Sequence, residues 1–173
     1  SFDAVITNMD KILEDNNIPK PYIFVGHSIG GLYSQFYCTK YAKKVVGLIL
    51  VDSSDNTQAF KDELVRSLDE KENKIRKAIY KKWLVYLECI KIDINKDIIV
   101  ITHLNIITNK KKQKWVSNGN IEVYQREAKI IEEYNESLVK NPKSSIVKYY
   151  NSSHMLHYVF PKKIMASIKS FFE

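Results

Sequence analysis

One serine of this chain is surrounded by glycines in a pattern suited to nucleophilic catalysis. Ser28 lies in the sequence Gly-His-Ser-Ile-Gly-Gly, which holds three of the chain's five glycines. A serine nucleophile must stand at the tip of a sharp strand-to-helix turn, where the residues two before and two after it come too close to carry a Cβ. Gly26 and Gly30 occupy those two positions. At such a turn the N–H of Ile29 would face a developing oxyanion, so the motif predicts a serine nucleophile at Ser28.

The elements that must position Ser28 are readable on both sides of it. The apolar run Tyr22–Val25 precedes the motif and predicts a strand covered on both faces, and a helix follows the glycines. The pattern further predicts helices over Phe2–Asn16, Thr57–Ile90 and Ile121–Leu138 and from Pro161 onward, and strands over Val45–Val51, Ile98–Thr102 and Ser145–Tyr150. Strands that alternate with helices indicate an α/β fold with parallel strands.

Length, apolar runs and charge distribution argue against a membrane-spanning protein and against a specific nucleic-acid binder. The chain has 173 residues, which suits one domain, and a net charge of +7 from 27 basic and 20 acidic residues. The longest apolar run, Val45–Val51, is far shorter than the roughly 20 residues of a membrane span. The lysines are scattered through every segment and are not clustered with stacking aromatics, which argues against specific nucleic-acid binding.

The two cysteines predict no metal or redox site. Cys38 falls in a predicted helix and Cys89 in an apolar stretch, with neither a CxxC nor a metal-ligand spacing. Buried free thiols are therefore expected, which favours a reducing compartment and a cytoplasmic location.

From the serine motif outward, the sequence resembles the α/β-hydrolase superfamily over most of its length. Residues 21–54, PYIFVGHSIGGLYSQFYCTKYAKKVVGLILVDSS, resemble its fifth strand, nucleophile elbow, following helix and sixth strand. Residues 149–172, YYNSSHMLHYVFPKKIMASIKSFF, resemble its last strand, histidine loop and final helix. The resemblance implies one hydrolase domain over residues 1–173, a mostly parallel sheet with flanking helices, and a small helical cap at residues 57–92. It also implies an N-terminally incomplete domain, because relatives have four strands before the nucleophile strand.

The same resemblance assigns roles to particular side chains. Ser28 would be the nucleophile and His154 the general base, with His157 as the competing histidine. His27, beside the nucleophile, would line the substrate pocket, whereas His103 receives no role.

The acid of the triad has several candidates. Relatives usually carry it after the strand that corresponds to Ile98–Thr102, but the segment at residues 103–113 contains no Asp or Glu. Asp52, directly after the preceding strand, is the main candidate, and Asp55 is a second. Asn105 or Asn109 would orient an imidazole without stabilising its charge.

These features predict a serine hydrolase that cleaves an ester, thioester or similar acyl bond of a small molecule through an acyl-enzyme. No metal and no organic cofactor is implied. The alternative is a truncated, catalytically inactive α/β-hydrolase-like protein that binds through its pocket or an exposed edge strand. Neither the identity of the substrate nor an oligomeric state follows from the sequence.

Overall fold

The computed structural model describes residues 2–54, 56, 61, 94–104, 121–150 and 152–172. The predicted cap at residues 57–92 lies outside the described residues apart from Lys61, and so do Asp55, Cys89, Asn105 and Asn109. Within the described ranges, none of the helices combines the length and the apolar character of a membrane span.

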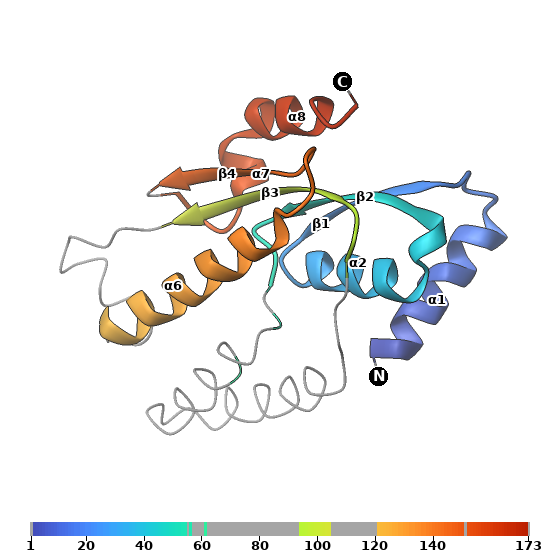
Figure 1. Ribbon diagram of the computed structural model, residues 1–173, viewed down its shortest axis with the longest axis horizontal. Coiled ribbons are helices and arrows are strands. Elements are labelled where there is room, and N and C mark those ends of the chain that lie inside the picture. The colour runs from blue at the N-terminus through green and yellow to red at the C-terminus, as the bar shows by residue number, and fades with distance from the viewer. Residues whose placement is uncertain are drawn as a thin grey trace.

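Four parallel strands form the centre of the molecule (Figure 1). They lie side by side in chain order: β1 (Tyr22–His27), β2 (Val45–Val51), β3 (Asp97–Leu104) and β4 (Ser145–Tyr150). The described helices are α1 (Phe2–Asp15), α2 (Ile29–Lys40), α6 (Ile121–Leu138), α7 (Leu156–Val159) and α8 (Pro161–Lys169), with a 3-10 turn at Ala42–Lys44. The sequence predicted this α/β architecture, and the bounds of β2, α6 and β4 are the predicted ones.

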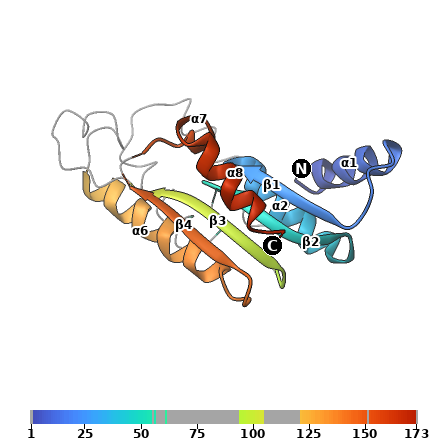
Figure 2. The same cartoon turned by 90° about the horizontal axis from the view of Figure 1, so that it is seen from above.

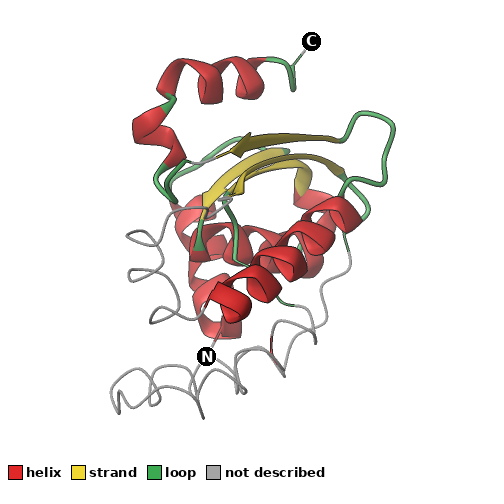
Figure 3. Ribbon diagram, turned by 90° about the vertical axis from the view of Figure 1, so that its left-hand side faces the viewer, coloured by secondary structure: helices red, strands yellow, loops and turns green. Residues whose placement is uncertain are grey.

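Helices cover both faces of the sheet (Figure 3). One core lies between the sheet and α2, and it contains Leu48 and Leu50 of β2, both fully buried. A second core lies beneath α7 and α8, and it contains Ile49 and Val51 from the other face of β2. Successive side chains from Leu48 to Val51 therefore enter different cores, which explains why this part of β2 is apolar throughout, whereas Val46 is exposed.

The prediction that β1 is covered on both faces is wrong. Val25 is 54% exposed, and Ile23 is only partly buried. The core beneath α7 and α8 is built on the inner strands, whereas β1 is one of the two outermost strands of the described sheet (Figure 2). β1 also runs two residues further than predicted, because Gly26 and His27 pair with the end of β2.

Cys38 confirms the expectation of a buried thiol. Its side chain on α2 is 2% exposed and forms no disulfide. Burial raises the pKa of the Cys38 thiol, which keeps it protonated and unreactive.

Candidate active site

The turn at Ser28 has a backbone conformation that side chains rarely adopt. Ser28 stands between the last residue of β1 and the first residue of α2, with φ 54° and ψ −126°. Its N–H donates to the carbonyl of Val51 at 3.2 Å, and its carbonyl accepts from the N–H of Ser54 at 3.1 Å. A conformation of this kind costs about 1–3 kcal/mol and persists only where the surroundings hold it. Here the end of β2 holds it from both sides.

Close approach at this turn requires two glycines, but not the predicted pair. A Cβ on Gly26 would lie 2.5 Å from the Cα of Gly31 and 2.7 Å from the carbonyl oxygen of Gly30. A Cβ on Gly30 would meet no atom within 4 Å, so the expectation for that position is wrong. A Cβ on Gly31 would instead collide with Ser53. The reason is that α2 turns the third residue after Ser28, and not the second, toward the strands.

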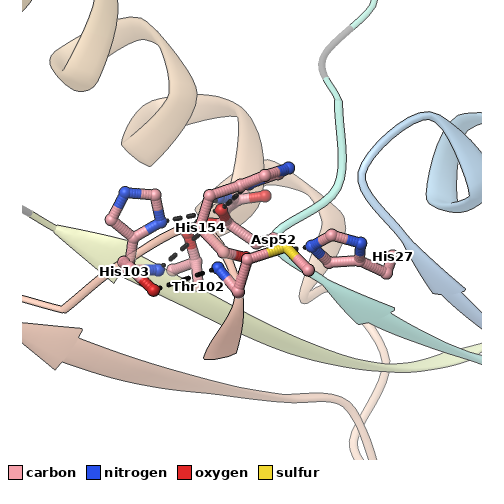
Figure 4. Close-up of polar contacts among 8 residues, drawn as sticks. His27, Asp52, Thr102, His103 and His154 are labelled. Atoms are coloured by element: carbon pink, nitrogen blue, oxygen red, sulfur yellow. Dashed lines mark hydrogen bonds and ion pairs between the residues drawn. The ribbon is translucent and has the colours of Figure 1, made fainter. Parts of the chain in front are cut away.

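The parallel sheet brings the carboxyl ends of its strands to one edge, where an aspartate and two histidines meet (Figure 4). Asp52 follows β2, His103 lies near the end of β3, and His154 lies in the loop after β4. Oδ2 of Asp52 accepts a hydrogen bond from Nδ1 of His154 and another from Nδ1 of His103 at 2.7 Å. Oδ1 accepts from the backbone N–H of His103 at 3.2 Å and from the hydroxyl of Thr102 at 3.3 Å.

These contacts favour an ionised carboxylate. Asp52 is only 9% exposed, and burial by itself would raise its pKa. The hydrogen bond and charge of His103, followed by the hydrogen bond of His154, outweigh burial and hold the pKa of Asp52 below its ordinary value. Asp52 therefore carries a negative charge at neutral pH and can stabilise an imidazolium beside it.

Helix α6 supports the carboxylate through a buried polar chain. Nδ2 of Asn135 donates to the hydroxyl of Thr102 at 3.2 Å, and that hydroxyl in turn donates to Asp52. Both Asn135 and Thr102 are almost completely buried. This series of hydrogen bonds holds Asp52, whose φ is 46°, in its strained conformation at the end of β2.

Replacing Thr102 by valine is expected to destabilise the protein by about 1–3 kcal/mol, because the amide of Asn135 loses its buried acceptor and Asp52 loses a donor. Urea-induced unfolding followed by circular dichroism measures the change. Thr102→Ser is the matched control, because it keeps the hydroxyl and removes only a methyl group. Equal losses in the two variants would show that the methyl group matters and the hydrogen-bond chain does not.

The site residues predicted from the sequence fall into two groups: Asp52 and His154, which contact each other, and the residues that lie near this pair. Asp52 and His154 are hydrogen-bonded to each other. Ser28 lies on the same edge of the sheet, directly after His27, and the ring centroids of His27 and His154 are 4.5 Å apart. In the described part of the chain, the Ser28 hydroxyl makes no hydrogen bond. As the first residue of α2, Ile29 has an N–H without a partner inside the helix, as an oxyanion donor requires.

The two other predicted histidines, His27 and His157, lie beside the hydrogen-bonded pair of Asp52 and His154. His27 donates from Nε2 to the carbonyl of His154 at 2.9 Å, so it fixes the backbone of the histidine loop. Its predicted role in lining the substrate pocket stays a prediction. His157 packs against the ring of His27 at 4.7 Å, and its buried Nδ1 has no hydrogen-bond partner among the described residues.

His103 is the site residue that sequence reasoning missed. Sequence patterns alone assign no role to this histidine, which follows a predicted strand. A usable signal existed, since His103 and Asp52 both stand at the carboxyl ends of predicted parallel strands. Those ends share one edge of a sheet.

Comparisons with known proteins agree with this fold. A family model described as the alpha/beta hydrolase fold matches residues 1–80, and no curated protein matches the chain in sequence. A "probable hydrolytic enzyme" from Pseudomonas aeruginosa superposes with a TM-score of 0.63 at 13% identity, over 100% of this chain and 70% of that one. An alpha/beta hydrolase from a lagoon metagenome superposes at 0.58 and 11% identity, over 99% and 69% of the two chains.

A third solved structure is a carboxylesterase from the thaumarchaeon Nitrososphaera gargenis. It superposes with a TM-score of 0.57 at 16% identity, over 99% of this chain and 71% of that one. The parallel sheet with its flanking helices is thus the α/β-hydrolase fold. The family model describes the same fold over residues 1–80, and the solved structures resemble this chain in fold.

Proposed function

We propose that this chain is a serine hydrolase that cleaves an ester, thioester or similar acyl bond of a small molecule. Ser28 is the nucleophile, His154 the general base and Asp52 the acid of the triad. The observation that carries the proposal is the hydrogen bond between Asp52 and His154, at the sheet edge where the strained turn presents Ser28. A structural aspartate alone would not require an imidazole on its carboxylate.

The hydrogen bond to Asp52 defines which ring nitrogen can act as the base. Nδ1 of His154 must carry the proton that it donates to the carboxylate, so Nε2 of the neutral ring keeps a lone pair. As Oγ of Ser28 bonds to the acyl carbon, its proton moves to Nε2, and the imidazolium is stabilised by the charge of Asp52. The N–H of Ile29 donates to the oxygen that becomes negative.

Collapse of the tetrahedral intermediate completes acylation. The bond to the leaving group breaks, and the leaving group takes the proton from Nε2 of His154. Water then attacks the acyl-enzyme and gives its proton to the same nitrogen, after which the acid is released and Ser28 is reprotonated. No step requires a cofactor.

Labelling with a fluorophosphonate tests this function directly. Oγ of an activated serine bonds to phosphorus and fluoride leaves, so intact-mass spectrometry is expected to show one adduct per chain. The adduct is expected to be absent from Ser28→Ala and present in Ser34→Ala, which removes a serine hydroxyl from the same helix region. An unlabelled, folded protein would contradict the hydrolase and favour a binding protein with this fold.

A further inference from the structure

All four histidines of the chain gather around one buried carboxylate. The ring of His154 lies 4.5 Å from that of His27 and 6.3 Å from that of His103, and His157 lies 4.7 Å from His27. A serine hydrolase needs one imidazole on its acid, yet Oδ2 of Asp52 carries two. The proposed reaction gives no use to the second imidazole.

The surplus imidazole completes the donor set of a transition-metal site. One ligand atom from each of Asp52, His103 and His154 lies within 4.8 Å of the others. Imidazole nitrogen and carboxylate oxygen bind zinc at about 2.0–2.2 Å, which places neighbouring ligand atoms about 3–3.5 Å apart. One metal ion could therefore lie between Oδ2 of Asp52 and the two Nδ1 atoms, where the N–H protons now lie, after only small side-chain movements. Two histidines and one carboxylate also leave coordination positions open for water.

The carboxylate of this donor set is fixed before any metal arrives. Oδ1 of Asp52 is held by the backbone N–H of His103 and by Thr102, which leaves Oδ2 directed at the two rings. Contacts of this kind, which orient a ligand without touching the metal, raise metal affinity. The ligands come from three separate segments that the sheet holds together, so they form a built site.

We propose that Asp52, His103 and His154 bind one transition-metal dication, such as Zn²⁺, and that the bound metal switches the hydrolase off. The inhibitory part rests on the proposed function, whereas the binding part does not. The metal is an inhibitor here and takes no part in the reaction.

The inhibition follows from the tautomer of His154. Catalysis requires the ring proton on Nδ1, facing Asp52, and the lone pair on Nε2. A metal ion at Nδ1 uses the lone pair of that nitrogen, so the proton of the neutral ring moves to Nε2 and none is gained or lost. Nε2 is then a donor and cannot accept the proton of Ser28. The metal also neutralises the charge of Asp52, which can no longer stabilise an imidazolium.

Binding is tested by calorimetric titration of the whole chain with ZnCl₂ after treatment with EDTA. One Zn²⁺ per chain is expected. His103→Gln removes a ligand and is expected to weaken binding at least about 100-fold. His157→Gln is the matched control, because it removes an imidazole of the same cluster that is outside the ligand set, and it is expected to keep the site. Absence of stoichiometric binding, or equal weakening in both variants, would overturn the proposal.

A second measurement avoids the variants in case His103→Gln does not fold. A crystal of the unaltered protein soaked in ZnCl₂ is expected to show anomalous density between Asp52, His103 and His154. Density at other residues only would overturn the site.

The inhibitory effect is measured as the rate of fluorophosphonate labelling of Ser28 with saturating Zn²⁺ and with EDTA. Zinc is expected to lower that rate at least about tenfold in the unaltered chain, and this sensitivity is expected to disappear at the same zinc concentration in His103→Gln. Bound zinc without slower labelling would overturn the inhibition. If Ser28 is unlabelled even in EDTA, the hydrolase proposal fails, while the titration still decides the metal site.

Discussion

Replacing Asp52 by asparagine is expected to lower kcat for ester hydrolysis by about 10⁴-fold, the loss that the same change produces in Ser-His-Asp triads. The amide has no charge with which to stabilise the imidazolium. Its NH₂ group can also donate to Nδ1 of His154, which moves the ring proton to Nε2 and removes the lone pair that must accept the proton of Ser28. Hydrolysis of a chromogenic acetate ester measures the effect, and the rate of fluorophosphonate labelling reports it independently.

Asp3→Asn is the control for this substitution. Asp3 lies on α1, away from the carboxyl edge of the sheet, and within the described residues its carboxylate is paired only with Lys40, at the last residue of α2. Loss of such an exposed surface pair is expected to change the stability little and to leave labelling of Ser28 unchanged. Should Asp52→Asn retain most of its activity, another residue would have to orient the base, and the assignment of the acid would be wrong.

The second large effect is expected at the turn that carries Ser28. Gly26→Ala introduces a Cβ that would lie under 3.0 Å from backbone atoms of Gly30 and Gly31, where no flexible side chain can give way. The backbone must shift, and we expect the free energy of unfolding to fall by about 3 kcal/mol. The shift also moves the serine, so labelling of Ser28 is expected to slow by about 100-fold. Urea unfolding and labelling measure the two effects on the same sample.

Gly30→Ala separates this steric effect from a general effect of glycine substitution. It places the same methyl group four residues further along, at the second position of α2, where no atom lies within 4 Å. Alanine favours the helix over glycine by about 0.5–1 kcal/mol, so this variant is expected to be as stable as the original chain or slightly more stable. Equal destabilisation in both variants would refute the close approach at Gly26.

Features that depend on neighbouring residues in the chain could be predicted from the sequence. The bounds of β2, α6 and β4 followed from apolar runs and helical periodicity, and the position of the sharp turn followed from the glycines around Ser28. The exposure of Val25 could not be predicted in this way, because β1 has the same apolar composition as a central strand. Its burial depends on which elements lie above it, and the core beneath α7 and α8 is built on the inner strands.

The sequence by itself determined the α/β fold and the position of the sharp turn at Ser28, because both are encoded in short local patterns. Only the tertiary structure decided which groups surround Asp52. The register of β2 and β3, in which Val51 pairs with Ile101, places Asp52 beside Thr102 and His103, about 50 positions further along the chain. The loop after β4 then adds His154 to the same carboxylate. The predicted strand ends place Asp52 and His103 at one edge of the sheet, but strand register and loop placement, which are set by packing between distant segments, decide which groups at that edge are in contact.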